Sequence, residues 1–529
     1  MEITIDNYFQ KEQEIKSDIK NCDFLSFDLE MTGISIGARH ILDSPNERYL
    51  KHKSSAEKYK IIQLGLVPWF KKYDEKNKNK VIYEAKPYNI YVFPGKEMEH
   101  TTLSCEVSAL IFNSKHGMNF NTWISKGVNY LNNKNYINLL QRKKNNNFNT
   151  IKNAEKKIFY KSEDKLIYDE FEKKFFDFYE INDETNKIFR YKKIPIYMIY
   201  HFISKLKEEI KNKIYIDIEK NEEHPGDDKI IIQKVTKEER DKLIDESNNK
   251  FMKQMEKARG VSNIWQEIVT NKKIIIGHNL SLDILYCFTH FGENLPENYD
   301  SFKQLVLSSF NGVYDTKYLY NNLSPKEETR SDLPLEGIYE KLSTKFKNSL
   351  DVKIPNGFID YLSKMDKKEN EYHQADFDAF ITGLSFCYLY ENYIANNTEK
   401  EKMMQFFNYK VHFMKTFYKS FDFKNNEEFL VPKTIPYCLR SMNKTCDFDL
   451  EKIIADEKLY SLIKEKLYIE NTNAMLILID TTGDFQALEA KLMENNQKYF
   501  HVMQLDEFKK IIKEEEMLRK DKYDKYKIK

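Results

Sequence analysis

The sequence lacks several features that would assign it to a familiar class. Its six cysteines are scattered and form no C-x-x-C pair, which argues against a zinc ribbon or a disulfide framework and fits a reducing compartment. The 84 Lys and Arg nearly cancel the 83 Asp and Glu. A net charge of +1 gives no global argument for nucleic acid, so any such surface would have to be a local patch. No internal repeat is present.

Long apolar runs are missing as well. No run approaches the roughly 18 residues that a membrane-spanning helix needs. The start, MEITIDNYFQKEQEIK, has neither the basic residues nor the apolar stretch of a secretory signal. We therefore expect a soluble, intracellular protein with no membrane partner. Nucleus and cytoplasm cannot be separated on this basis.

The chain does contain enough apolar material for a sizeable core. Of its 529 residues, 41% are hydrophobic and 14% aromatic, so wholesale disorder is not expected. Runs rich in β-branched and aromatic residues at 24–33, 60–70 and 88–94 predict three strands of an antiparallel meander. The Asn- and Lys-rich tract 141–157 predicts an exposed loop. VYDTKYL, 313–319, predicts a further short strand.

The stretch FLSFDLEMTG places two carboxylates, Asp28 and Glu30, inside an apolar strand pattern. Residues i and i+2 of a strand share a face, so these two side chains project together. Burying both costs several kcal/mol each unless a cation compensates. Such a pair suits Mg²⁺ or Mn²⁺, although many strands carry the same pattern on a solvent face.

Two further stretches carry similar chemistry. In IIIGHNLSLD a buried strand ends before Asn279, and Asp283 falls in the first turns of the next helix. The simpler interpretation makes Asn279 or Ser281 a helix cap and Asp283 a favourable charge at the helix start. In HQADFDAFITG, His373 and Asp378 stand at the start of another helix, where a capping or core histidine is the simpler account.

Taken together, the three stretches resemble the signature of the DEDD exonuclease superfamily in its histidine-containing subclass. They occur in the order D-x-E, G-H-N-x-x-x-D and H-x-x-x-x-D, each at a strand end or helix start. Four carboxylates can hold two divalent ions about 4 Å apart, which clamp the attacking water and the leaving oxygen of a phosphoryl displacement. A histidine with a pKa of about 6.5 can take the proton of that water.

Within that superfamily, most of residues 1–393 resembles the poly(A)-specific ribonuclease (PARN) family. The segments that carry the resemblance are DLEMTGIS, SPNERYLKHK, NIYVFP, SKHGMNFNTWISKGVNYLN, KARGVSNIWQEIV, VYDTKYL and H-x-A-x-x-D-A-x-I-T-G. The resemblance implies an α/β fold of the ribonuclease H-like DEDD type, a mixed sheet flanked by helices. It also implies an inserted small α+β module and a C-terminal RNA-recognition-motif-like α/β sandwich.

The predicted organisation follows from this resemblance and from the changes in pattern along the chain. The predicted parts are the first part of the nuclease domain at 1–160, the inserted nucleic-acid-binding-like module at 161–255, the second part of the nuclease domain at 256–420, a divergent RNA-recognition-motif-like domain at 425–510 and a charged tail at 511–529.

The resemblance also assigns roles to single residues. Asp28, Glu30, Asp283 and Asp378 would bind the metals, and His373 would be the general base. The predicted RNA contacts are Met31, Ile34, Leu110, Asn279 and Lys317. Core packing is an equally good account of Met31 and Leu110, and Lys317 could equally be an exposed charge in an ion pair. Without metal, the crowded carboxylates should destabilise the site locally or carry a raised pKa.

Two departures from the family pattern concern RNA binding. The Arg-x-x-x-His spacing of the family's inserted domain is absent, since His201 has Tyr197 where the Arg would stand. RNA binding by this module is then no better supported than a structural or dimer-supporting role. The chain's three Trp residues precede the C-terminal region, and the K/R-G-F/Y-x-F/Y pattern is missing. Tyr460, Tyr468 or Tyr499 could substitute, but 5′ cap binding is left doubtful.

The function that these residues predict is a Mg²⁺-dependent 3′-to-5′ exoribonuclease that degrades poly(A) and releases 5′-AMP. Two ions are expected, with Mn²⁺ able to substitute, and the expected partner is RNA with a 3′ poly(A) or A-rich end. The resemblance implies a homodimer, and the expected localisation is nucleus and cytoplasm without distinction between them. Alternatives are a 3′ trimmer of small or non-coding RNA with little adenine preference and an inactive RNA-binding scaffold, the latter disfavoured because all five catalytic residues are present. A DNA exonuclease has support only at superfamily level.

Overall fold

The computed structural model describes most of the chain in two compact units. Unit 1 combines Met1–Val128 with Ile264–Lys529, and unit 2 is Asn129–Asn263. The described residues are 1–35, 42–74, 81–98, 100–145, 148–149, 162–181, 187–219, 228–325, 333–366, 372–414, 416, 418–426, 433–443, 449–469 and 472–515. Among them, no helix is both long and apolar enough to cross a membrane.

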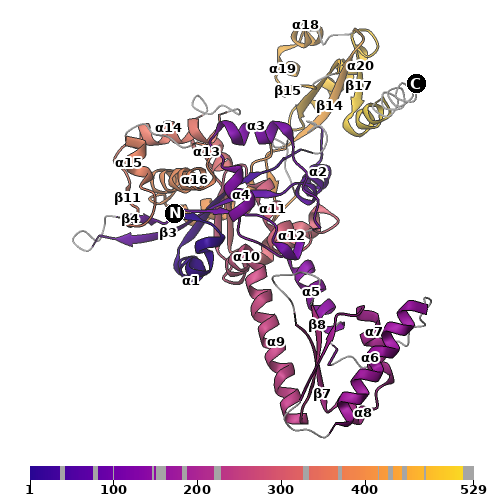
Figure 1. Ribbon diagram of the computed structural model, residues 1–529. Helices are drawn as coiled ribbons and strands as arrows, with labels where there is room; N and C mark the ends of the chain where they lie inside the picture. The colour runs from indigo at the N-terminus through magenta and orange to yellow at the C-terminus, as the bar shows by residue number, and fades with distance from the viewer. Residues whose placement is uncertain are drawn as a thin grey trace. The chain divides into compact units, whose positions relative to one another are not determined.

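Unit 1 is built on a mixed sheet of ten described strands (Figure 1). The order is β1-β5-β3-β2-β9-β10-β12-β13, with β4 on β3 and β11 on β4. The bounds are β1 Glu2–Ile3, β2 Phe24–Met31, β3 Ile61–Tyr73, β4 Val81–Ala85, β5 Tyr88–Tyr91, β9 Ile274–Gly277, β10 Gly312–Asp315, β11 Asp351–Lys353, β12 Lys410–Val411 and β13 Phe421–Asp422. β2, β3 and β5 pair antiparallel as predicted, whereas β9 and β10 run parallel to β2.

Helices flank this sheet, which confirms the predicted α/β class. Their bounds are α1 Ile5–Asn21, α2 Pro45–Lys58, α3 Val107–Lys115, α4 Phe120–Lys126, α10 Val261–Thr270, α11 Ser281–Phe291, α12 Tyr299–Ser309, α13 Thr316–Leu323, α14 Leu335–Lys345, α15 Tyr361–Asp366, α16 Ala375–Leu389 and α17 Lys400–Phe407. One hydrophobic core lies between the sheet and α16, with Trp69 stacked on Phe24 and Phe380.

The prediction of a strand over 313–319 is wrong in its second half. β10 ends at Asp315, whose carboxylate accepts hydrogen bonds from the backbone N–H groups of Lys317 and Tyr318 at 2.9 and 3.1 Å. This N-cap starts α13 at Thr316. The loop predicted over 141–157 is likewise helical in its first residues, since α5 extends over Asn133–Asn145; 146–147 and 150–157 lie outside the described residues.

Unit 2 is a small α+β structure that contains the described part of the predicted module 161–255. Its sheet has the order β6-β8-β7 and is antiparallel throughout. The bounds are α5 Asn133–Asn145, α6 Ser162–Glu180, β6 Ile188–Lys192, α7 Ile196–Lys205, α8 Glu208–Lys211, β7 Ile214–Glu219, β8 Lys229–Lys234 and α9 Lys237–Arg259. α6 and α7 lie on one side of the sheet (Figure 1). Their aromatic residues belong to the same buried cluster as residues of the strands. His201 is buried there, with its ring 5.0 Å from that of Tyr168.

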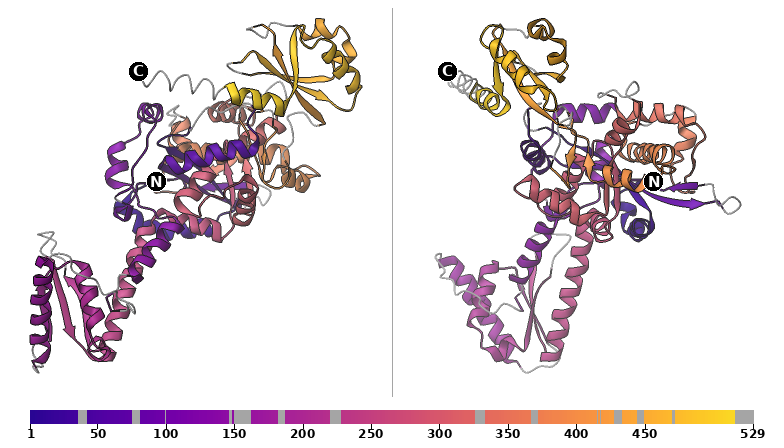
Figure 2. Two further views of the ribbon diagram at one scale, coloured as in Figure 1. Left: turned by 90° about the vertical axis from the view of Figure 1, so that its right-hand side faces the viewer. Right: turned by 180° about the vertical axis from the view of Figure 1, so that it is seen from behind.

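The C-terminal region has the β-α-β-β-α-β order of ferredoxin-like folds, which RNA recognition motifs share (Figure 2). Its sheet order is β15-β16-β14-β17. The bounds are β14 Thr434–Ser441, α18 Leu450–Ile454, α19 Glu457–Tyr460, β15 Ile463–Ile469, β16 Ala474–Asp480, α20 Phe485–Glu494 and β17 Phe500–Gln504. α18 and α20 pack on one face. The other face is also covered, since Cys438, Leu476 and Leu478 contact Leu505 and Phe508 of the following helical residues, 505–515.

Candidate active site

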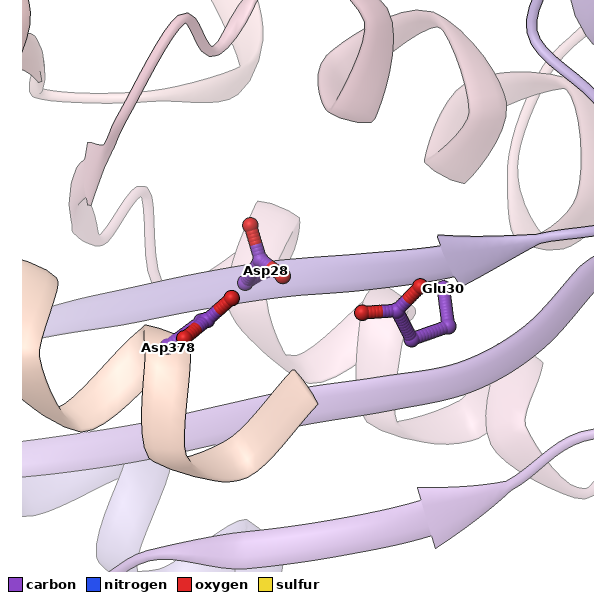
Figure 3. Close-up of side chains that lie close together, drawn as sticks. All are labelled: Asp28, Glu30 and Asp378. Carbon is purple, nitrogen blue, oxygen red and sulfur yellow. The ribbon is translucent and has the colours of Figure 1, made fainter. Parts of the chain in front are cut away.

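Three acidic side chains from two distant parts of the chain meet at one point of unit 1. Asp28 and Glu30 lie on β2, and Asp378 lies in the first turn of α16 (Figure 3). One carboxylate oxygen from each lies within 4.8 Å of the others, close enough for a shared metal ion. Figure 3 shows the three carboxylates facing one another between strand and helix. This is the donor set that Mg²⁺ or Mn²⁺ prefers.

A glycine on the neighbouring strand lets α16 come this close. Gly65 of β3 is directly opposite Asp28, and a Cβ at Gly65 would lie 1.9 Å from the carbonyl oxygen of Ala375. Any other residue there would push the start of α16 away from β2. Ser26 fixes the contact, because its hydroxyl donates to the carbonyl oxygen of Ala379 at 2.7 Å. The same local packing therefore brings Asp378 to Asp28.

The crowding of these carboxylates is visible in their pKa values. Burial, then repulsion from Asp378, Asp283 and Glu30, raises the pKa of Asp28 well above its ordinary value. Burial, then repulsion from Asp378 and Asp283, does the same for the pKa of Glu30. Burial raises the pKa of Asp378 to about 7, although the His373 backbone N–H opposes the shift. A raised pKa is the state expected for this site without a compensating cation.

Asp283 also repels Asp28 and Glu30, but it lies on a different element of the fold, helix α11. It is buried in the first turn of α11, and burial raises the pKa of its carboxyl to about 7. The start of α11 is fixed by Asp315, whose carboxylate accepts a hydrogen bond from the Leu280 N–H at 3.0 Å. One buried carboxylate, Asp315, thus anchors the starts of both α11 and α13. The helix predicted to carry Asp283 in its first turns is confirmed as α11, Ser281–Phe291.

His373 lies beside Asp378 in an uncommon backbone conformation. Its φ of 68° is in the left-handed region, which a non-glycine residue adopts only when its surroundings hold it there. Its backbone N–H donates to the Asp378 carboxylate oxygens at 3.2 and 3.3 Å, and its Nδ1 lies 4.0 Å from Oδ2 of Asp378. Burial and the nearby His116 lower the pKa of the imidazole, which favours the neutral form that can accept a proton.

The predicted apolar RNA contacts surround the end of β2. Met31 is 9% exposed, as core packing would require, whereas Ile34 is 41% exposed. Leu110 is half-buried on α3. The side chain of Glu106 ties α3 to this strand end, because its carboxylate accepts the N–H groups of Ile34 and Ser35 at 3.0 and 3.2 Å. Ile34 and Leu110 therefore retain surface for a base, and Met31 retains little.

The two polar residues predicted to contact RNA lie deeper. Asn279 has a φ of 55° and is not the cap of α11, which begins after Leu280. Its Oδ1 is buried and has no hydrogen-bond partner among the residues that the structure describes. Lys317 is not an exposed charge on a strand. It is 3% exposed in the first turn of α13, and its Nζ donates to the carbonyl oxygen of Leu333. An RNA contact by either residue stays a prediction.

Several residues around this site carry no signal in the sequence. Asp315 looks like an ordinary helix cap, and only the fold shows that it also holds α11. Phe112 and His116 of the α3 segment contact the His373 ring, with ring centroids 4.8 and 4.1 Å away. Such contacts join residues about 260 positions apart, so no local pattern could reveal them. His116 would have been found only by asking which side chains pack on the His373 ring.

Comparison with known protein families assigns the chain to a class of nuclease. A family model described as CAF1 family ribonuclease matches residues 3–386, which include all five residues of the predicted catalytic set. The chain belongs to this family.

Individual relatives show which ribonucleases the chain resembles. The chain is 26% identical over 417 residues to "Poly(A)-specific ribonuclease PARN" of Xenopus laevis, an alignment that covers 75% of this chain and 63% of that protein. The human protein of the same name is 26% identical over 414 residues, with 75% and 62% covered. The "Pre-piRNA 3'-exonuclease trimmer" of Bombyx mori is 26% identical over 415 residues, with 74% and 71% covered. The chain thus spans about three fifths of the length of the curated PARN relatives.

Among solved structures, the chain is similar to the Mg²⁺- and Mn²⁺-bound form of S. pombe Pop2p. The TM-score is 0.35 and the sequence identity 11%, over 76% of this chain and 95% of that one.

Proposed function

We propose that this chain is a divalent-metal-dependent 3′-to-5′ exoribonuclease that degrades poly(A) and releases 5′-AMP. The observation that supports it most is the meeting of Asp28, Glu30 and Asp378 within 4.8 Å. Asp283 lies close enough to raise the pKa of two of them, and His373 lies beside Asp378. Membership of a ribonuclease family and the names of the PARN relatives support the reaction class and the substrate.

The donor set fits a metal. All members are carboxylates, and burial raises the pKa of each, with repulsion from the other site carboxylates as a further cause for Asp28 and Glu30. Asp28, Glu30, Asp283 and Asp378 would hold two Mg²⁺ ions, with Mn²⁺ as a substitute. Bound there, the ions would polarise the scissile phosphate and lower the pKa of the attacking water.

The protein's own contribution is to orient the general base. His373 would accept the proton of the attacking water at its imidazole, and the hydrogen bonds from its backbone to Asp378 hold it against the metal-binding carboxylate. Because its pKa is lowered, the imidazole is neutral at neutral pH and available as an acceptor. The 41% exposed side chain leaves room for water and the 3′ end.

A substitution at Ile34 tests the apolar contact. Ile34→Ala is expected to raise KM for oligo(A) about fivefold or more and to leave kcat within twofold, since each CH2 group that a base would cover contributes about 0.8 kcal/mol. Ile34 is 41% exposed, so the fold should not suffer. Ile124→Ala, at an apolar residue on α4 that is 55% exposed, is the control and should change neither constant. A lower kcat with unchanged KM would contradict the assignment.

A second function is supported by one relative. The Bombyx trimmer is as similar to the chain as the PARN relatives are, and the alignment covers more of its length. Trimming of small RNA with little adenine preference would use the same catalytic residues. The trimmer would differ from the deadenylase only in the contacts that bind the bases at the 3′ end of the RNA.

One assay separates these functions. The wild-type chain with Mg²⁺ is incubated with 5′-labelled oligo(A), oligo(U), an RNA with a mixed 3′ end and single-stranded DNA. Rapid shortening of oligo(A) alone from the 3′ end supports the deadenylase, and equal shortening of all three RNAs supports the trimmer. If no substrate is shortened but the chain still binds RNA, the result supports an inactive RNA-binding scaffold.

Two partner predictions remain with this proposal. The resemblance implies a homodimer, which sedimentation equilibrium would test.

Cap recognition by base stacking on the C-terminal sheet has little support, because helical residues 505–515 cover the face opposite α18 and α20. Of the candidate tyrosines, Tyr468 is 64% and Tyr499 39% exposed.

A further inference from the structure

A second histidine packs directly on the predicted general base. The rings of His116 and His373 have centroids 4.1 Å apart and planes inclined at 66°, an edge-to-face contact. Phe112, one helical turn before His116, approaches both rings, with its centroid 4.5 Å from that of His116 and 4.8 Å from that of His373. Since the His373 side chain is 41% exposed, these two rings supply much of what restrains it.

The backbone of His116 is attached to the same segment. Its carbonyl oxygen accepts a hydrogen bond from the side-chain amide of Gln374, the residue that follows His373 and caps α16. His116 itself ends α3, and its N–H bonds to the carbonyl oxygens of Phe112 and Asn113. The left-handed backbone of His373 is therefore fixed on one side by Asp378 and on the other by the end of α3.

The other end of α3 is attached to the metal-binding strand. The Glu106 N–H donates to the carbonyl oxygen of Thr32 at 2.7 Å, and the Thr32 hydroxyl donates to the carbonyl oxygen of Ser104 at 2.8 Å. Asn113 adds a longer hydrogen bond of 3.4 Å to the Met31 carbonyl oxygen. α3 thus connects the strand that carries Asp28 and Glu30 with the residue that would act as base.

We propose that His116 is a positioning residue, which holds the His373 imidazole at the attacking water through ring packing and the Gln374 hydrogen bond. It touches neither the proposed metal ligands nor the reacting atoms. The inference rests on the proposed function, since it assigns His116 a part in that reaction. Through α3, a base seated on Ile34 or Leu110 would also steady the His373 ring, so that substrate binding and base placement are coupled.

The test compares three variants of the full chain. His116→Ala should lower kcat on oligo(A) about tenfold or more, with KM within twofold, because small displacements of a catalytic group cost up to about 100-fold. His116→Phe keeps an aromatic ring and should recover most of kcat. Lys115→Ala, at the neighbouring exposed position, should behave as wild type. The Mn²⁺-induced rise in melting temperature should be the same in all three.

Other results would overturn the inference. If His116→Ala leaves both kcat and KM unchanged, His116 has no role in the reaction. If it raises KM and leaves kcat unchanged, His116 contacts the RNA directly. Loss of the Mn²⁺-induced stabilisation would show a structural role at the metal site.

A readout without activity distinguishes this inference from the function itself. The ring ¹H–¹³C resonance of His373, assigned by its loss in His373→Ala, should shift in His116→Ala because a neighbouring ring current is removed. A resonance that does not move would overturn the ring contact, whatever the activity. Failure of the wild-type chain to shorten any RNA would overturn the proposed function even if that resonance moves.

Discussion

Asp28→Asn is expected to abolish exonuclease activity and, at the same time, to make the metal-free protein more stable. Asp28 is surrounded by Glu30, Asp283 and Asp378, and burial with their repulsion raises its pKa well above the ordinary value. An amide of the same shape removes one of the charges that repel one another. We expect a gain in unfolding free energy on the order of 1 kcal/mol at neutral pH, since one unit of pKa corresponds to about 1.4 kcal/mol.

The exonuclease activity of Asp28→Asn should fall, whereas the stability of the metal-free variant rises. An amide cannot supply the charge that a divalent ion requires, and loss of metal-assisted stabilisation of several kcal/mol corresponds to a fall in kcat of about 10³-fold or more. Binding of oligo(A) should stay within a few-fold of wild type, because the predicted apolar contacts are untouched. The measurements are chemical denaturation in the presence of a chelator and a single-turnover assay with Mg²⁺.

Asp300→Asn provides the matched control. Its side chain is 92% exposed in the first turn of α12, so the same change of charge should leave turnover unchanged and lower stability by about 0.3–1 kcal/mol, the opposite sign to Asp28→Asn. Wild-type turnover by Asp28→Asn would remove the metal-site assignment. A metal-free Asp28→Asn protein that is less stable than wild type would show that the carboxylate makes a favourable contact in the empty site.

The carboxylates of the candidate site could be predicted because each stands in a strand or at a helix start with a short local signature. Alternation along β2 was sufficient to place Asp28 and Glu30 on one face, and the strand before Asp283 is a continuous apolar run. The meander of β2, β3 and β5 followed from three runs rich in β-branched and aromatic residues that polar linkers separate. Local patterns are reliable here because each element's own side chains decide its conformation.

The errors arose where one side chain overrode local propensity. Val313 and Tyr314 favour a strand, and extending that strand through Lys317 ignored Asp315, whose carboxylate captures two backbone N–H groups and turns the chain into α13. Lys317 is buried as a consequence of that turn. The sequence contains both the strand propensity of Val313 and Tyr314 and the helix-capping side chain of Asp315, and the cap determines where the strand ends.

Other features depend on contacts that no local pattern encodes. The approach of Ala375 to Gly65, which brings Asp378 to Asp28, is set by which strands are neighbours and by their register. The packing of His116 on His373 is of the same kind. A sequence pattern can name the residues that carry the chemistry, but the residues that hold them in place become visible only in the folded chain.

Divalent metal is expected to stabilise unit 1 in a pH-dependent manner. Burial raises the pKa of Asp283 and Asp378 from 3.8 in ordinary carboxyls to about 7 in the folded chain. A group whose folded pKa is raised binds more protons when folded, so its contribution to stability is full below pH 3.8 and is lost as pH rises through about 7. The metal-free site therefore loses stability across that window.

A metal ion competes with those protons for the same oxygens. At about pH 5.5 the two carboxyls are mostly protonated, and Mg²⁺ or Mn²⁺ should raise the melting temperature little. At about pH 8 they are ionised, and metal at about 100 times its Kd should contribute about 2.7 kcal/mol, a rise of a few degrees. Thermal unfolding with and without Mn²⁺ at the two pH values measures the difference directly.

Glu30→Gln separates metal binding from general ionic effects. It removes one member of the three-carboxylate cluster, so the metal-induced rise at about pH 8 should nearly vanish while the effect of added KCl stays that of wild type. An equal rise at both pH values, or one that survives Glu30→Gln, would place the stabilising ion elsewhere. The repulsion that destabilises the metal-free site is the same property that lets it bind a divalent cation, so stability and metal affinity must change in opposite directions as the carboxylates are removed.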